Sequence, residues 1–317
     1  MLMRWVKQGR IFVTDSSLGW PYGHAQGPTV LVREDSLRIY FASRPEPGIS
    51  IPTFIDVDID DPKRILAVNE TPLLELGVRG TFDEFGIQPI EIIEQEDEIW
   101  LYYTGWDRGT TVSYRLSTGL AISRDGGRTF HKAFQGPILD RNKLEPFLTI
   151  APAIIREDGV WHAFYGSGVG YHLTEGRYEP QYIIKYATSS DGIDWQRPNI
   201  ACIEPKSELE SNTRPTVIKI GNTYHMWFAY RGAKDFRGGK ESYRIGYASS
   251  TDRINWDRDD SRAGIDVSEE GWDSAVITYP YVKKIRDRYL MFYNGNGFGA
   301  SGFGYAIADW GDEDAGR

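Results

Sequence analysis

Alternating apolar and polar positions recur along the chain in short runs, each about as long as a β-strand. The segment GIQPIEIIEQEDEIWLYY, residues 86–103, shows this unit clearly, because two apolar runs flank an acidic turn at 94–98. A period of two bounded by turn residues is typical of strands rather than of helices. The pattern therefore predicts a β-hairpin here.

Four relatives of this hairpin occur elsewhere, beginning near Gly27, Ala151, Arg214 and Tyr279. All five repeats have a proline near the start of the hairpin. These prolines are Pro28, Pro89, Pro152, Pro215 and Pro280, which lie 61, 63, 63 and 65 residues apart. A repeat of this length has room for four strands, which is typical of propeller blades. The alternative, a sandwich of unrelated hairpins, does not explain the even spacing.

The predicted fold is therefore all-β: a five-bladed β-propeller with four antiparallel strands per blade, in a single domain over residues 1–317. The last repeat supplies strands near 281–284, 289–293 and 302–307, so it lacks a fourth. The run RIFV, residues 10–13, precedes the first repeat and has the pattern of a lone strand. We expect this N-terminal strand to complete the C-terminal blade, because that closes the ring and removes an exposed sheet edge.

A Ser-x-Asp turn followed by an aromatic residue marks the second hairpin of three repeats. The turn aspartates are Asp125, Asp191 and Asp252, and the aromatic residues are Phe130, Trp195 and Trp256. Aspartate at such a turn accepts hydrogen bonds from backbone N–H groups, so we interpret these three as structural. A cation site at the turns is the alternative. We expect the aromatic residues to pack between neighbouring blades.

Composition narrows the possible partners. Thirty-six Lys and Arg against 45 Asp and Glu leave a net charge of −9, which argues against binding to nucleic acid or to an anionic membrane. The single cysteine, Cys202, excludes an internal disulfide and fits a reducing compartment. No apolar run approaches the length of a signal sequence core or a membrane span. Cytoplasmic localisation is the default expectation.

The longer connections are predicted to gather on one face of the propeller. They are 43–50, 105–116, 166–180, 231–241 and 294–301, together with the polar segments that precede each proline. If the first strand of each blade runs away from this face and the second returns to it, the short turns lie on the opposite face. Long loops in an otherwise economical fold are often functional, so we look for the site here.

Acidic residues on this face are candidates for catalysis. Asp83 and Asp273 each lie shortly before a blade-entry proline and follow an aromatic residue, Phe82 or Trp272, that can shield them from water. The alternative is that each caps a turn. Glu91 lies on an otherwise apolar inner strand, where a carboxylate is costly unless it faces the channel or pairs with a cation. Glu91 is therefore either a site residue or part of a structural ion pair.

Polar and aromatic residues on the same face are candidates for binding a substrate: His24, Gln26, Gln88, Trp106, Tyr165, Arg214, Arg231, Trp272 and Asn294. Arg214 either binds a carboxylate, phosphate or hydroxyl group, or neutralises a neighbouring acid. Asn294 is either a ligand or a turn residue. No cluster has the spacing of metal ligands, and the glycine-rich run at 295–299 opens no helix, so neither a metal nor another cofactor is expected.

Several motifs support a family resemblance. The five-fold repeat, the proline-led entries and the Ser-x-Asp-Gly-x-x-Trp/Phe turns together resemble the five-bladed β-propeller glycoside hydrolases. That group includes the family 43 arabinanases and xylosidases, the invertase-like fructosidases and the mannoside phosphorylases. More narrowly, the chain looks like a glycosidase-like group of bacterial polysaccharide gene clusters in the runs GLAISRDGGRTF, GPILDR, IKYATSSDGIDW, RIGYASS, GWDS and YNGNGFG. SRDGGRTF resembles the Asp-box of the six-bladed sialidases, but this chain has five proline-led repeats, which predict five blades. The resemblance spans residues 10–310 and implies action on a saccharide.

The chain departs from the family 43 pattern where that family carries its catalytic residues. The Asp-Pro of the general base corresponds to 27–28, which is Gly-Pro, and the Asp-Pro that tunes the acid corresponds to 151–152, which is Ala-Pro. The segment 212–215, Asn-Thr-Arg-Pro, replaces the acidic residue of the fourth blade. The Pro-Ile-Glu at 89–91 is similar to that family's Ala-Pro-Glu. The catalytic residues therefore do not transfer position by position.

Two functional hypotheses follow. The first is an enzyme that acts on a glycosidic bond of an oligosaccharide or glycoconjugate, as a hydrolase or a phosphorylase, with Asp83 and Asp273 as acid and base. The second is a non-catalytic carbohydrate-binding propeller or an assembly factor in surface-polysaccharide metabolism. The separation of the two carboxyl groups discriminates between them, because glycosidases need about 5 to 9.5 Å.

Overall fold

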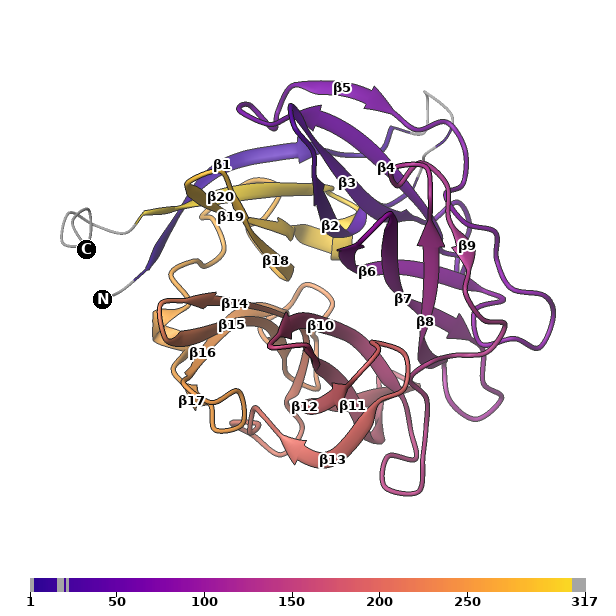
Figure 1. Ribbon diagram of the computed structural model, residues 1–317. Coiled ribbons are helices and arrows are strands. Elements are labelled where there is room, and N and C mark those ends of the chain that lie inside the picture. The colour runs from indigo at the N-terminus through magenta and orange to yellow at the C-terminus, as the bar shows by residue number, and fades with distance from the viewer. Residues whose placement is uncertain (1–2, 16–19, 21–22, 310–317) are drawn as a thin grey trace.

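The strands form five four-stranded antiparallel sheets, one for each repeat, as the proline spacing predicts (Figure 1). The computed structural model describes residues 3–15, 20 and 23–309. Blade one contains β2 (Gln26–Val32), β3 (Ser36–Ser43), β4 (Ile51–Asp58) and β5 (Ile65–Val68), and blade two contains β6 (Gly86–Gln95), β7 (Glu98–Asp107), β8 (Arg115–Ser123) and β9 (His131–Lys132). Blade three contains β10 (Thr149–Glu157), β11 (Val160–Thr174), β12 (Arg177–Ser189) and β13 (Gln196–Ala201), and blade four contains β14 (Ser211–Ile220), β15 (Thr223–Arg231), β16 (Arg244–Ser250) and β17 (Asp257–Arg258).

Blade five joins the two ends of the chain. It contains β18 (Thr278–Ile285), β19 (Arg288–Asn294) and β20 (Phe303–Asp309), with β1 (Arg4–Phe12) as its outer strand. Figure 1 shows the indigo β1 beside the yellow β20, and the two strands pair antiparallel along their length. The predicted closure of the ring by the N-terminal strand is confirmed, although the strand begins earlier than residue 10. Its Trp5 packs edge-on against Trp227 of blade four, at 5.3 Å between ring centroids.

The inner strands β2, β6, β10, β14 and β18 surround the central channel, and each carries a β-bulge next to its proline. We call the residues before these prolines the pre-proline ring: Gly27, Gln88, Ala151, Arg214 and Tyr279. Four of them have left-handed backbone angles, with φ of 70° at Gly27, 50° at Ala151, 48° at Arg214 and 55° at Tyr279. Such angles are costly for residues other than glycine, and a bulge re-aims the side chain that it carries. The bulges therefore set the direction of the ring side chains.

The Ser-x-Asp turns are structural, as the sequence predicts. Asp252 accepts hydrogen bonds from the N–H groups of Asn255 and Ile254 at 2.8 and 2.9 Å. These bonds, led by the one from Asn255, hold the pKa of Asp252 well below its ordinary value. The following aromatic residues lie between blades: Trp256, for example, packs edge-on against Phe164 of blade three at 5.4 Å.

The connection at 166–180 differs from the expected loop, because it continues the β11–β12 hairpin. Glu175 and Gly176 form its tip, with φ of 50° and 75°. Positive φ at both central residues matches the type I′ turn that suits the twist of paired strands. Helical structure in the described residues is limited to the 3₁₀ segments η2 (Asp260–Arg262) and η3 (Asn296–Gly299), and none of the helices there is long and apolar enough to cross a membrane.

Candidate functional site

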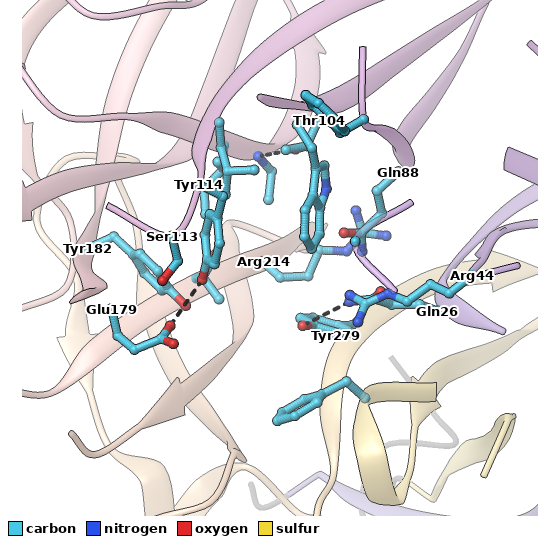
Figure 2. Close-up of a pocket in the computed structure, with 18 of the residues that line it drawn as sticks. Gln26, Arg44, Gln88, Thr104, Ser113, Tyr114, Glu179, Tyr182, Arg214 and Tyr279 are labelled. Carbon is cyan, nitrogen blue, oxygen red and sulfur yellow. Dashed lines mark hydrogen bonds between the residues drawn. The ribbon is translucent and has the colours of Figure 1, made fainter. Parts of the chain in front are cut away.

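A cavity of about 370 Å³ opens where the inner strands begin (Figure 2). Each of the five long connections contributes to its lining: Gly48 from the first, Trp106 from the second, Glu179 from the third, Phe236 from the fourth and Phe298 from the fifth. The prediction that these connections gather on one face is therefore confirmed. Loops from all five blades surround a single hollow.

Aromatic rings form much of the cavity wall. Trp106 lies against Tyr114, with ring centroids 5.5 Å apart. Tyr182 and Tyr243 share a hydrogen bond of 2.8 Å between their hydroxyl groups. Burial raises the pKa of Tyr114 and of Tyr243 well above the ordinary value, so both remain neutral phenols. The wall offers apolar faces together with phenolic hydroxyl groups.

Arg214 forms the floor of the cavity and is 2% exposed. Its guanidinium crosses the channel and donates to Thr29 Oγ1 at 2.9 Å, and to the carbonyls of Pro28 and Pro89 at 3.4 Å each. Burial lowers the pKa of Arg214 to about 10. One side chain of blade four thereby links blades one and two.

Glu91 is 8% exposed and does not line the cavity. Tyr281 donates to Glu91 Oε1 at 2.6 Å, and the N–H of Ile92 donates to the same oxygen at 3.1 Å. The charge of Glu91 favours the protonated form of Arg214 electrostatically, although the two make no ion pair in the described residues. Of the alternatives from the sequence, a structural role for Glu91 fits these contacts better.

Two carboxylates line the cavity wall. Glu179 is 1% exposed, accepts from Arg237 Nη2 at 2.5 Å, and lies 3.4 Å from the Tyr114 hydroxyl. Asp107 pairs with Arg115 at 2.5 Å and remains partly exposed. Glu179 lies on β12, opposite His172 of β11, and Asp107 lies at the end of β7, opposite Arg115 of β8. They are the acids that a ligand in this cavity would meet.

Asp83 and Asp273 lie elsewhere. Each is 1% exposed, and neither lines the cavity. Asp83 pairs with Lys132 of the outer strand β9 at 2.6 Å and accepts from Tyr103 at 3.0 Å. Asp273 pairs with Lys7 of the outer strand β1 at 2.7 Å and accepts from the hydroxyl of Tyr293 at 3.0 Å. The expectation that the two share one funnel does not match this placement, since each belongs to the outer side of a different blade.

The same arrangement recurs in blades three and four. In blade three, Glu145 pairs with Arg197 of β13 at 3.1 Å and accepts from Tyr165 at 2.8 Å. In blade four, Glu210 pairs with Arg258 of β17 at 2.6 Å. We call these four contacts the outer-strand ion pairs. A contact repeated in four blades points to a role in the framework, and the catalytic assignment of Asp83 and Asp273 remains a prediction without support from the geometry.

The structure brings four of the predicted binding residues together at the cavity: Gln26, Gln88, Trp106 and Arg214. The other five do not line it: His24, Tyr165, Arg231, Trp272 and Asn294.

The contacts of three of those five residues show where they lie instead. Arg231 lies behind the wall and donates to the Pro180 carbonyl at 2.8 Å and to the Tyr243 hydroxyl at 3.1 Å. Asn294 uses its amide to join blades five and one, through bonds of 2.7 Å with the N–H of Gly27 and the carbonyl of Ala25. Trp272 stacks on Tyr293, with ring centroids 5.2 Å apart.

His24 is half-buried near the cavity. Burial and, second, the charge of Arg44 lower the pKa of His24 to about 4.

Sequence reasoning missed several lining residues, among them Arg44, Tyr114, Glu179, Tyr182 and Tyr279. Tyr279 could have been found, because it occupies the same pre-proline position as Arg214. Arg44 and Glu179 carry no such signal. Each lies in a connection whose length and sequence differ from those of the corresponding connections in the other repeats, so its direction depends on how the loops pack.

These features define a class of fold, the five-bladed β-propeller, and similar propellers are found among carbohydrate enzymes. A glycoside hydrolase structure has a TM-score of 0.71 with 18% identity, covering 97% of this chain and 92% of that one. A thermostable family-43 glycoside hydrolase has a TM-score of 0.64 with 17% identity, covering 90% and 89%. A structure from the GH130 family of mannoside phosphorylases has a TM-score of 0.71 with 13% identity, covering 97% and 94%.

Sequence similarity identifies the family. The chain is 35% identical over 309 residues to the uncharacterized protein Rv1502 of Mycobacterium tuberculosis (strain ATCC 25618 / H37Rv), covering 97% of this chain and 100% of the relative. The chain belongs to the same protein family as Rv1502. It is also 27% identical over 155 residues to a 1,2-beta-oligomannan phosphorylase of Thermoanaerobacter sp. (strain X514), covering 48% of each chain. No protein-family model matches the chain.

Proposed function

We propose that this protein is carbohydrate-active, and that it binds a saccharide in the central cavity and acts on a glycosidic bond there. The observation that carries the proposal is the cavity itself, a hollow of about 370 Å³ with aromatic faces and buried polar groups. Sugars stack their apolar C–H faces on aromatic rings, and their hydroxyl groups bind amides, carboxylates and guanidinium groups. The propeller fold and the partial similarity to an oligomannan phosphorylase support the same proposal.

Glycosidic bond cleavage generally uses two carboxyl groups on opposite sides of the bond. In this cavity the candidates are Glu179 and Asp107 rather than Asp83 and Asp273. Arg237 and Tyr114 hold Glu179 by the contacts described above, which fixes the direction of its carboxylate. We propose that Glu179 contacts the saccharide at the reacting bond and that Asp107 is the second carboxylate.

One observation favours the second candidate function, a saccharide-binding propeller without catalysis. The pre-proline ring carries no carboxylate, since it consists of Gly27, Gln88, Ala151, Arg214 and Tyr279. These are the positions that the bulges direct toward the channel. Both cavity carboxylates, in addition, are already paired with arginines.

Turnover measurements separate the two functions. The purified protein is incubated with a panel of oligosaccharides that includes β-1,2-mannosides, once in water alone and once with inorganic phosphate. For an enzyme, we expect Glu179→Gln to lower the turnover about 100-fold or more, the scale of a lost acid or base group. Glu94→Gln, at an exposed residue of β6 that does not line the cavity, is the control and should retain full activity.

Saccharide binding without turnover would select the non-catalytic function. A panel that shows neither binding nor turnover would contradict the proposal as a whole.

A further inference from the structure

The lining of the cavity is cationic although the protein is acidic. Five arginines reach it, against two carboxylates, in a chain whose net charge is −9. Asp107 forms an ion pair with Arg115, and Glu179 forms one with Arg237. Among the described residues, the remaining lining arginines make no ion pair: Arg44, Arg108, Arg177 and Arg214. The excess positive charge therefore faces the space that a ligand would occupy.

Arg44 is the clearest case. It lies at the cavity wall beside Trp106, with its guanidinium 5.2 Å from the centre of the Trp106 ring. Its Nε is buried and has no hydrogen-bond partner in the described part of the chain. Burial lowers the pKa of Arg44. The groups that raise it are the phenols of Tyr279 and Tyr114, not carboxylates. A buried guanidinium without a counterion is costly unless a ligand supplies one.

Arg214, Arg44 and Tyr279 all line the cavity. Burial raises the pKa of Tyr279, and the charges of both guanidinium groups act in the opposite direction. The Nε of Arg214 is also buried and unpartnered, although its other nitrogens donate to backbone and to Thr29. Two buried guanidinium groups in the lining of one cavity form a local concentration of positive charge. Arginine is the side chain best suited to bind a carboxylate or a phosphate through two parallel hydrogen bonds.

Neutral hydrogen-bonding groups lie beside these charges. Gln26 is 2% exposed, and its Nε2 donates to the Tyr279 hydroxyl at 3.2 Å, while its Oε1 is buried without a partner. Gln88 is 7% exposed and also lines the cavity. Figure 2 shows Arg44, Gln26, Gln88 and Tyr279 on one side of the cavity, opposite Glu179. An unpartnered acceptor next to unpartnered donors suits a hydroxyl group that is adjacent to an anionic group.

We propose that Arg44 and Arg214 form a subsite for an anionic group of the saccharide, a carboxylate or a phosphate, and that Gln26 and Gln88 bind hydroxyl groups beside it. This inference rests on the proposed function and narrows it to acidic or phosphorylated saccharides. The anionic group would complete the hydrogen bonds of both guanidinium groups. Glu179, on the opposite side, would then meet the uncharged part of the same ligand.

Calorimetric titration tests the subsite with matched ligands. The probes are a uronic-acid oligosaccharide and its carboxyl-reduced neutral counterpart, a sugar phosphate and its parent sugar, and inorganic phosphate alone. We expect at least one anionic probe to bind about tenfold or more tightly than its neutral counterpart, since charge-assisted hydrogen bonds are the strong ones. We also expect that affinity to fall as salt is added. Preference for the uronic acid, the sugar phosphate or free phosphate identifies the source of the anion.

Variants of Arg44 test whether this residue causes the preference for the anionic probe. Arg44→Gln should remove the preference for the anionic probe while it leaves the affinity for the neutral counterpart within about twofold. Arg44→Lys, which keeps the charge but not the paired geometry, should restore part of the preference. Arg128→Gln, at an exposed turn, is the matched control. If Arg44→Gln does not fold, the salt dependence of binding to the wild-type protein still tests whether positive charge in the cavity holds the anionic probe.

The outcomes separate this inference from the proposed function. Equal affinity for anionic and neutral saccharides, unchanged in Arg44→Gln, would overturn the subsite and leave the proposed function standing. Binding of inorganic phosphate that depends on Arg44, without binding of any saccharide, would support the subsite and contradict the proposed function. If no probe binds at all, both are wrong.

Discussion

Arg214 of blade four donates a hydrogen bond to the hydroxyl of Thr29 in blade one, at 2.9 Å across the channel. The same guanidinium also reaches the carbonyl of Pro89 in blade two. Three blades therefore meet at one buried side chain, which forms the cavity floor. Its left-handed backbone angle, φ of 48°, is the strained conformation that directs it inward.

Replacement of Arg214 should destabilise the propeller. Arg214→Met retains much of the length of the side chain but leaves Thr29 and the buried proline carbonyls without a donor. We expect the free energy of unfolding to fall by about 1–3 kcal/mol, the cost of unsatisfied buried polar groups. Denaturant titration measures this change, with Arg128→Met as the exposed control. An unchanged midpoint would show that the cross-channel bonds do not contribute to stability.

The outer-strand ion pairs predict structural variants. Asp83→Asn and Asp273→Asn should each lower the free energy of unfolding by about 1–3 kcal/mol, since each leaves a lysine beside a weaker, neutral partner. The two changes lie in different blades, so their effects should add to within about 0.5 kcal/mol. Saccharide binding by the folded variants should be unaltered. Loss of activity at unchanged stability would instead restore the catalytic hypothesis for these residues.

Trp106 should contribute to saccharide affinity. It presents an aromatic face to the cavity next to Tyr114 and Arg44, and stacking of a sugar on this face is lost in Trp106→Ala. We expect the affinity to fall about tenfold, because aromatic contacts add about 0.5–1.5 kcal/mol to the effect of burial. Tyr178→Ala, at a 48% exposed aromatic residue outside the cavity, is the control for calorimetry. Equal affinities in the two variants would place the saccharide elsewhere.

His24 should make stability depend on pH. Its pKa is about 4 in the folded protein and 6.5 in its ordinary environment. Above pH 6.5 the His24 ring is neutral in both the folded and the unfolded protein, and stability does not depend on its titration. Between pH 6.5 and 4 the ring binds a proton in the unfolded protein but not in the folded one. Stability should therefore fall as the pH is lowered through this range.

The variant His24→Asn tests the assignment. The difference in urea midpoint between this variant and the wild type should vary between pH 6.5 and 4 and remain constant above 6.5. Arg44→Gln should raise the pKa of His24 toward its ordinary value, because the positive charge of Arg44 contributes to the lowering. Titration of the His24 ring by NMR measures that shift. Parallel stability curves for variant and wild type would contradict the assignment.

Much of the fold could be predicted because it depends on local, repeated patterns. The five prolines and the alternation of apolar residues indicate five blades, and the incomplete last repeat indicates closure by the N-terminal strand. The same comparison of repeats also contained evidence against Asp83 and Asp273 as a catalytic pair. Each precedes a tyrosine by 20 residues, Tyr103 or Tyr293, and Glu145 precedes Tyr165 by the same interval. A repeated interval is a property of the framework.

The sequence by itself determined the blade architecture, the structural role of the aspartate turns and the face on which the loops gather, since strand period, turn chemistry and repeat length are properties of neighbouring residues. The tertiary structure alone decided which side chains meet in the cavity. Arg44 and Glu179 belong to connections whose lengths and sequences differ from blade to blade, and 135 sequence positions separate them. Their placement on opposite walls depends on ring closure and loop packing, which no local pattern encodes.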